Sequence, residues 1–311
     1  MKKILFTGGG GVGNEALWKL FSSHYDLYFA DSNIEAINPC IPRERKILIP
    51  LATDKKFKAE LKKISKNLKL DFIVPSVDEE LVELADARNE FDADIFLPNV
   101  DFVKLMLNKC KCAHEISKFG LSAPVTQFAK NSSSIDFPLI VKPNSGRGSK
   151  GVMIVNSQKE LDAYRDLYRL TVKDPIVQDL AIGQEYTVLV SSNNLGKLNS
   201  IIPIKVGQKK GITIRAKIDM NPLVIDYTKS FHKCFPTMGI YNIQCILTSK
   251  GIVLPFEINP RISTTFCISI AAGFDPFSEY YEKNINNSLF IPKEDLCLER
   301  NWVNNITSCK E

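Results

Sequence analysis

The first hundred residues alternate short apolar runs with amphipathic stretches, and this alternation constrains the fold more than any other feature of the sequence. The apolar runs are ILFTG, DLYFAD and DFIVPS, and the amphipathic stretches cover residues 14–24, 57–68 and 79–91. Short apolar runs indicate buried strands, while apolar residues at helical spacing indicate helices between them. We therefore predict that residues 1–100 form a domain built on a parallel sheet.

The pattern changes near residues 99–101, where we place a domain boundary. One helix is expected from near Phe102 to Gly120, because glycine commonly follows the last turn of a helix. Strand-like runs follow, namely FPLIVKP, GVMIV, DPIVQDL, EYTVLVSS and LNSIIPIKV, with a helix expected over residues 158–168. Residues 101–311 are therefore expected to form an α+β domain based on antiparallel sheets.

The composition is that of an ordinary globular protein, with 44% hydrophobic and 24% charged residues in a chain of 311. The first apolar run is short and is followed by glycines, so we expect a cytoplasmic protein without a membrane segment. The net charge is +5 and both signs are interleaved, so no nucleic-acid surface is expected. The eight cysteines lack paired CxxC spacing, which argues against a zinc site or a disulfide framework.

A glycine cluster follows the first predicted strand. Gly8, Gly10 and Gly13 match GxGxxG, and Asp31 ends the next strand, where an acid could bind the ribose of a dinucleotide. The alternative is a tight turn between strand and helix that binds no dinucleotide. The cluster alone does not decide between these two interpretations.

A second glycine-rich segment, FPLIVKPNSGRGSKGV, has the features of a phosphate-binding loop. Lys142 ends a predicted strand, and Gly146, Gly148 and Gly151 are interspersed with Arg147, Ser149 and another lysine. Free backbone N–H groups and cations on a flexible loop neutralise a polyphosphate. The segment lacks GxxxxGK[ST], so it is not a Walker A loop.

The stretch IYNIQCILTSKGIVLPFEINPRIS predicts a hairpin with oxygen ligands on one face. If Lys250 and Gly251 form a two-residue turn, Gln244 lies directly opposite Glu257. Asn259 lies two residues further along the strand and therefore shares that face. Carboxylate and amide oxygens suit Mg²⁺, but a slip of one residue would separate them. Pro255 suggests an edge strand or a bulge.

These segments, in this order, resemble the ATP-grasp superfamily, and the hairpin is similar to that of the carbamoyl-phosphate synthetase large chain. No second synthetase half is present in the sequence, so the closer analogy is a free-standing carboxylate-amine ligase. The resemblance implies a mixed α/β and α+β class, in which an N-terminal Rossmann-like domain precedes the ATP-grasp domain in the sequence. It also implies a small lid subdomain at about residues 125–180 and a metal-binding subdomain at about residues 181–311.

The resemblance implies roles for individual residues. Those expected to bind ATP are Lys109, Lys142, Gly146, Arg147, Gly148, Ser149, Gly151, Gln178, Asp179, Leu180 and Glu185. Glu185 would bind the ribose, and residues 178–180 would contact the adenine edge. Gln244, Glu257 and Asn259 would hold Mg²⁺ or Mn²⁺, with Arg261 near the transferred phosphoryl group. The sequence departs from the family pattern where Asn108 replaces an acid and where Gln178 and Asp179 replace two acids.

The implied reaction converts a carboxylate and ATP into an acyl phosphate, which an amine or a thiol then displaces. Small-molecule substrates are the expected partners, and a homodimer is considered as the assembly. Lys205 and Arg215 lie in a segment where family members bring cations near the phosphates. The resemblance implies a catalytic role for Arg215. Asp78, Glu79 and Glu80 are candidates for binding a substrate amine, although an exposed helix N-terminus rich in acids is the commoner explanation.

Two other functions stay open at this point. The first is an NAD(P)-binding oxidoreductase that uses the N-terminal glycine cluster and Asp31. The second is a protein that senses ATP without turning it over, although Glu257 and Asn259 argue against a loss of metal-dependent chemistry.

Overall fold

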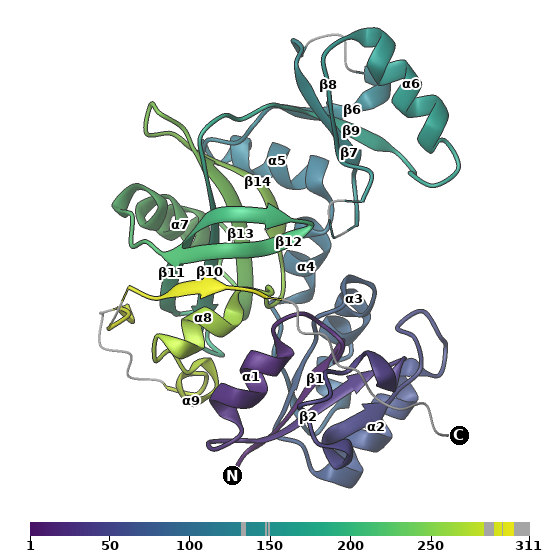
Figure 1. The fold of residues 1–311 in the computed structure, drawn as a ribbon, viewed down its shortest axis with the longest axis vertical. Coiled ribbons are helices and arrows are strands. Elements are labelled where there is room, and N and C mark those ends of the chain that lie inside the picture. Colours follow the sequence, from purple (N-terminus) through teal and green to yellow (C-terminus); the bar gives the residue numbers. More distant parts are fainter. Residues whose placement is uncertain (132–134, 147, 149, 283–288, 294, 302–311) are drawn as a thin grey trace.

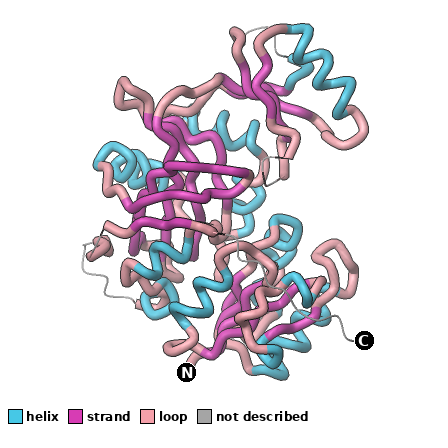
Figure 2. The backbone as a smooth tube through the Cα atoms, viewed as in Figure 1, coloured by secondary structure: helices cyan, strands magenta, loops and turns pink. Residues whose placement is uncertain are grey.

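The computed structural model describes residues 1–131, 135–146, 148, 150–282, 289–293 and 295–301. In these residues three sheets follow one another through the molecule, which confirms the predicted mixed class (Figures 1 and 2). The parallel sheet lies at one end, a four-stranded sheet with α6 lies at the other, and a six-stranded sheet lies between them (Figure 1). No described helix is both long and apolar enough to cross a membrane.

The N-terminal sheet is entirely parallel and has the strand order β3-β2-β1-β4-β5. Its strands are β1 (Lys3–Thr7), β2 (Asp26–Asp31), β3 (Lys46–Leu48), β4 (Phe72–Val74) and β5 (Asp94–Ile95). The helices between them are α1 (Asn14–Phe21), α2 (Phe57–Leu68) and α3 (Asp78–Asp86). The apolar runs and amphipathic stretches thus form the strands and helices that their patterns predict.

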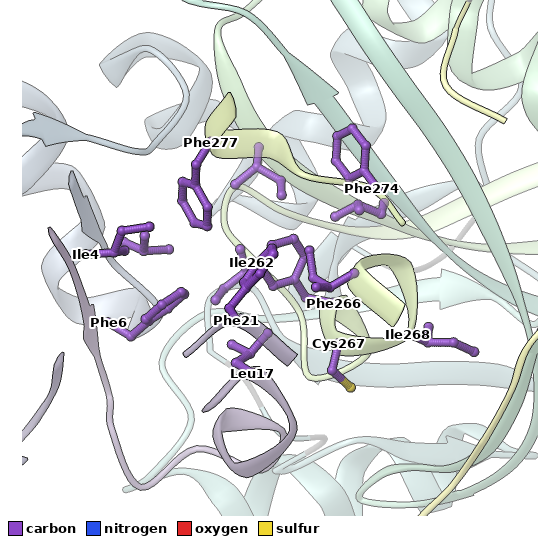
Figure 3. Close-up of a cluster of buried hydrophobic side chains, with 14 of the residues drawn as sticks. Ile4, Phe6, Leu17, Phe21, Ile262, Phe266, Cys267, Ile268, Phe274 and Phe277 are labelled. Carbon is purple, nitrogen blue, oxygen red and sulfur yellow. The ribbon is translucent and has the colours of Figure 1, made fainter. Parts of the chain in front are cut away.

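Both faces of the parallel sheet are buried, but by different parts of the chain. Leu5 faces a core formed with α2 and α3, while Ile4 and Phe6 face the opposite side. On that side α1 is joined by α8 (Phe266–Ala271) and α9 (Pro276–Glu279) from far along the sequence (Figure 3). The Phe277 ring lies 5.4 Å from that of Phe72, measured between centroids. The core of the first sheet therefore depends on helices from residues 266–279, far along the sequence.

The single helix expected from Phe102 to Gly120 is wrong, because two helices occupy this stretch. They are α4 (Val100–Met106) and α5 (Lys109–Lys118). Asn108 separates them: its side-chain oxygen accepts a hydrogen bond from the Lys111 N–H at 3.0 Å and caps α5. Asparagine is a preferred N-cap residue, and this signal inside an otherwise helical pattern marks the break.

The four-stranded sheet, which we call the lid sheet, is antiparallel with the order β6-β9-β7-β8. Its strands are β6 (Thr126–Phe128), β7 (Leu139–Pro143), β8 (Met153–Val155) and β9 (Pro175–Asp179). Helix α6 (Gln158–Tyr168) covers one face, where Leu139, Val141 and Val177 pack with Leu161 and Tyr164. The other face of the lid sheet is directed toward the six-stranded sheet.

The six-stranded sheet is also antiparallel, with the order β14-β13-β10-β11-β12-β15. Its strands are β10 (Gln184–Ser192), β11 (Leu198–Lys210), β12 (Ile212–Ile218), β13 (Gly239–Leu247), β14 (Val253–Asn259) and β15 (Cys297–Glu299). One face packs against α4, α5 and α7 (Pro222–Cys234). The opposite face contributes Leu189, Ile202 and Ile204 to the core shared with the N-terminal domain. The remainder of that face is available to line a cavity.

Candidate functional site

A cavity of about 240 Å³ separates the lid sheet from the six-stranded sheet. Its described lining residues are Lys109, Ile140, Lys142, Pro143, Gly146, Lys150, Val152, Gln178, Asp179, Ala181, Glu185, Lys209, Gln244, Ile246, Phe256 and Glu257. Predicted phosphate, ribose and metal residues from four separate segments of the sequence therefore lie around one space. We call this space the nucleotide cavity, after the residues predicted to bind ATP that line it.

Lys142 is held in place by neutral groups at the wall of this cavity. Its side chain is buried, with 4% exposed, and its Nζ donates to Gln178 Oε1 at 2.8 Å and to the Phe256 carbonyl at 2.9 Å. Gln178 in turn donates from Nε2 to Thr126 Oγ1 at 2.8 Å. Burial lowers the pKa of Lys142 from 10.5 to about 8, although nearby Glu257 opposes this shift. The Gln178 side chain thus positions the lysine and does not point a free amide at a ligand.

Two acids at the cavity are paired with lysines. Glu257 lies 3.5 Å from Lys109, measured from Oε1 to Nζ, and Lys109 also donates to the Gly146 carbonyl at 2.8 Å. Glu185 accepts a hydrogen bond from Lys209 at 2.7 Å. The cavity therefore contains cations for phosphates and acids for hydroxyls or metal ions, arranged as pairs. Lys209 is not among the residues predicted to bind ATP, although it lies in the same basic segment as Lys205 and Arg215.

The hairpin of β13 and β14 has the predicted pairing of Gln244 with Glu257. The turn itself is not the two-residue turn that led to this prediction, because Thr248 bonds back to Ile252 and Leu247 pairs with Val253. A bulge between Gln244 and Cys245 restores the register further along. The bulge and the edge position of β14 also match the expectation raised by Pro255.

The oxygen-bearing side chains fit the ligand chemistry of Mg²⁺. Gln244 and Glu257 both line the cavity, and Asn259 alternates onto the face of Glu257 because Ile258 packs on the other side. Asn259 lies opposite Asn242, whose buried Nδ2 has no hydrogen-bond partner among the described residues. No cluster of three His, Cys, Asp or Glu side chains suits a metal in the described part of the chain. The candidate set instead combines one carboxylate with amide oxygens.

Arg261 lies at a second cavity of about 580 Å³, next to the N-terminal domain. Its Nε donates a hydrogen bond to Asp78 Oδ1 at 2.6 Å. The carboxylate of Asp78, at the start of α3, therefore orients the Arg261 guanidinium. Gly148 also lines this second cavity, and Lys150 lines both cavities. The described residues Gly148 and Lys150 of the glycine-rich loop therefore lie at the boundary between the two spaces.

Several predicted residues lie elsewhere. Arg215 is exposed on β12 and pairs with Glu299 at 2.8 Å, so the structure does not bring it to the nucleotide cavity. Lys205 lies directly opposite Tyr186 on the neighbouring strand, so its side chain is on the sheet face that α7 covers. Leu180 and Gly151 are not among the described lining residues. Arg147 and Ser149 lie outside the described residues.

The acids at the start of α3 have structural contacts. Glu80 is buried, and its carboxylate accepts hydrogen bonds from the backbone N–H groups of Ser76 and Val77, each at 3.0 Å, and from the Thr7 hydroxyl. These bonds fix the turn before α3 to the end of β1. Asp78 is engaged with Arg261, and Glu79 also has an interaction partner. None of the three stands as a free amine-binding acid.

The glycines of the N-terminal cluster are in close contact with other residues of the chain. The Gly10 N–H donates to Asp31 Oδ2 at 2.9 Å, so the acid proposed for a ribose instead caps the glycine turn. A Cβ at Gly10 would lie 2.7 Å from that of Ala36, and one at Gly13 would lie 2.9 Å from the Thr264 carbonyl. Close packing therefore explains these glycines, which favours the tight-turn interpretation over the dinucleotide site.

Comparison with known proteins agrees with this geometry. The family model of the ATP-grasp domain matches residues 106–265. The formate-dependent phosphoribosylglycinamide formyltransferase of Prochlorococcus marinus is 25% identical over 87% of this chain and 73% of its own length. The carbamoyl phosphate synthase arginine-specific large chain of Halalkalibacterium halodurans is 26% identical over 50% of this chain and 16% of its own.

Solved structures share the architecture. The L-amino acid ligase of Bacillus licheniformis superposes with a TM-score of 0.67 at 16% identity, over 90% of this chain and 73% of that one. At this identity the likeness concerns the fold, and it confirms the predicted ATP-grasp architecture with its N-terminal parallel sheet. The family model covers more than half of the sequence and includes the second glycine-rich segment, Glu185 and the β13–β14 hairpin. The chain belongs to the ATP-grasp family.

Proposed function

We propose that the chain is an ATP- and Mg²⁺-dependent ligase that joins a small carboxylate to an amine through an acyl phosphate. The observation that carries this proposal is the meeting of Lys142, Glu185 and the Gln244–Glu257 pair around one cavity. One relative is named for formate-dependent chemistry and one structural neighbour is named an L-amino acid ligase. These names support a carboxylate and an amine as substrates.

ATP would lie in the nucleotide cavity with its phosphates toward Lys109 and Lys142. Ile140, Ile246 and Phe256 offer apolar surface for the base. Glu185 would accept hydrogen bonds from the two ribose hydroxyls after release from Lys209. In the same way, phosphate would draw Lys109 from Glu257 and leave that carboxylate free for a metal ion.

Gln244, Glu257 and Asn259 would hold Mg²⁺, which supplies positive charge against the phosphates during transfer. Positioning and charge neutralisation carry phosphoryl transfer, so the chain itself need not supply a nucleophile. Lys142 and Lys109 bind and orient the nucleotide in this scheme. The lid sheet excludes water from the reacting groups.

The second cavity is the proposed place of the carboxylate and the amine. It lies at the carboxyl ends of β1, β2 and β4, where open parallel sheets commonly bind ligands. Lys150 borders both cavities, and Arg261 is oriented by Asp78 at the same boundary. A carboxylate there could attack the terminal phosphate of ATP across this boundary. We place this reaction in the cytoplasm.

A screen of ADP release tests the proposal and separates its alternatives. The chain is incubated with ATP and Mg²⁺ and with pools of amino acids, sugar amines and short carboxylic acids. We expect ADP release that depends on one acid and one amine together. ATP binding without stimulated ADP release from any pool would support a sensor, and NADH binding would support an oxidoreductase.

A further inference from the structure

A further cavity lies on the face of the lid sheet opposite the nucleotide cavity. It measures about 280 Å³ and is lined by the end of β6, by α6 and by the loop that leads into β9. Leu139 and Val141 face α6 on this side, whereas Ile140 and Lys142 line the nucleotide cavity. The lid sheet therefore separates this cavity from the nucleotide cavity, and we call it the outer lid cavity.

The outer lid cavity is positively charged. Its lining includes Lys130, Arg165 and Arg169 against one acid, Asp174. Arg165 is engaged, since it pairs with Asp162 at 2.9 Å and donates to the Ala129 carbonyl. Arg169 has no hydrogen bond or ion pair with the described residues. An unpaired guanidinium and a nearby ammonium favour an anionic ligand.

Aromatic side chains line the same cavity. The rings of Tyr164 and Tyr168 stack with centroids 4.6 Å apart, and Phe128 lies beneath the Lys130 ammonium at 5.7 Å. Flat apolar surface next to cations is suited to a ring that carries a negative group. This lining matches a small ligand that carries one ring and one anionic group.

A hydrogen bond connects this cavity to the glycine-rich loop. Tyr164 donates from its hydroxyl to the Gly151 carbonyl at 2.7 Å, and Gly151 ends the loop with φ at +68°. A Cβ on Gly151 would lie 3.4 Å from that hydroxyl and 3.3 Å from Val172, which also lines the outer lid cavity. A ligand that shifts Tyr164 or Val172 therefore acts directly on the end of the loop beside the nucleotide cavity.

We propose that the outer lid cavity is a regulatory site for a small aromatic anion, such as an aryl phosphate, whose binding changes the affinity of the chain for ATP. Lys130 and Arg169 bind the anionic group, and Tyr168 contacts the ring. Tyr164 transmits occupancy to Gly151. The inference relies on the proposed function only in taking ATP as the ligand of the nucleotide cavity.

Calorimetric titration of the chain with phenyl phosphate tests the site. Because phenyl phosphate could also enter the nucleotide cavity, the titration is made with saturating ATP present. We expect saturable binding that the double variant Lys130→Ala, Arg169→Ala weakens by about tenfold or more, since each cation offers a charge-assisted bond. Lys159→Ala, which removes an exposed lysine from the same helix, should leave binding unchanged. Absence of binding, or equal binding by the double variant, overturns the proposal.

The ATP affinity of the chain with and without phenyl phosphate tests the coupling. We expect a change of about fivefold or more, in the range typical of allosteric effects. Tyr164→Phe retains the ring but removes the bond to Gly151, so it should bind phenyl phosphate normally and lose the change in ATP affinity. An unchanged ATP affinity in the parent chain overturns the regulatory role. Neither measurement needs turnover, so failure of the ligase assignment would be seen separately in the ADP-release screen.

Discussion

The chain has two glycine-rich turns after strands, and they differ in what surrounds them. At the N-terminal turn, a Cβ on Gly10 would clash with Ala36, and the Gly10 N–H is already bonded to Asp31. In the second turn, a Cβ on Gly146 or Gly148 would meet no atom of the described residues within 4 Å. Both turns border the second cavity, but the first uses its glycines for close packing, while the second has open space around its described glycines. Glycine spacing alone therefore does not identify a nucleotide site.

Gly10→Val should produce the largest loss of stability of any single change in these turns. The added side chain would meet the Ala36 Cβ and carbonyl, so we expect a loss of about 3 kcal/mol in the free energy of unfolding. Urea unfolding measures this loss, and ATP titration of the folded fraction should give a parental affinity. A stable variant with weakened nucleotide binding would mean that the first turn contributes to the nucleotide site.

Lys142→Ala should weaken ATP binding strongly, because it removes a cation beside the second turn. A lost charge-assisted contact of about 2 kcal/mol corresponds to a decrease of about thirtyfold in affinity. The lysine is bonded to neutral groups, so its loss leaves no buried acid directly unpaired. Calorimetry measures the affinity, and Lys159→Ala is the matched control. An affinity equal to that of the parent would remove the second turn from the nucleotide site.

The pH dependence of ATP binding should report on the same lysine. Lys142 is charged below its lowered pKa of about 8 and loses that charge as the pH rises through this value. We therefore expect ATP affinity to fall between about pH 8 and pH 10, by at most about tenfold per pH unit. Bound phosphate stabilises the charged form and so raises the pKa of Lys142 in the complex, and the total fall in affinity reflects the difference between the two pKa values. Lys142→Ala should lack this decrease, and a parental profile in that variant would assign it to another group.

Arg215→Ala should have the smallest effect. Arg215 is exposed and paired with Glu299, and an exposed ion pair contributes about 0–1 kcal/mol. We expect substrate-stimulated ADP release within about twofold of the parent, measured at several ATP concentrations. A large decrease in turnover would bring β12 into the active site and extend the functional region beyond the second turn.

Local patterns predicted the fold well where one pattern determines one element. Residues 57–68 form α2 and residues 158–168 form α6, as their amphipathic spacing indicates. The break between α4 and α5 was missed because Asn108 sits inside continuous helical spacing and acts through its cap. The packing of α8 and α9 on the first sheet could not be predicted, since no local signal records which distant surface a helix covers.

The candidate site was predictable to the extent that its segments resemble a known family. Gln244 and Glu257 pair as expected, but two deviations compensate: the turn differs from the assumed one and a bulge restores the register. The side-chain partners were not predictable, because Lys209 reaches Glu185 and Arg261 reaches Asp78 only through tertiary packing. The role of Gln178 in holding Lys142 likewise depends on the pairing of β7 with β9.

The most direct test of the central claim is the rate of substrate-stimulated ADP release in Glu257→Gln. The substitution keeps the size of a side chain that lines the nucleotide cavity but removes the negative charge proposed to hold Mg²⁺. Glu44→Gln, at an exposed position, is the matched control. We predict that Glu257→Gln abolishes ADP release while its unfolding free energy stays near that of the parent and Glu44→Gln retains full activity. Near-parental ADP release by Glu257→Gln at ordinary Mg²⁺ concentrations would contradict the account.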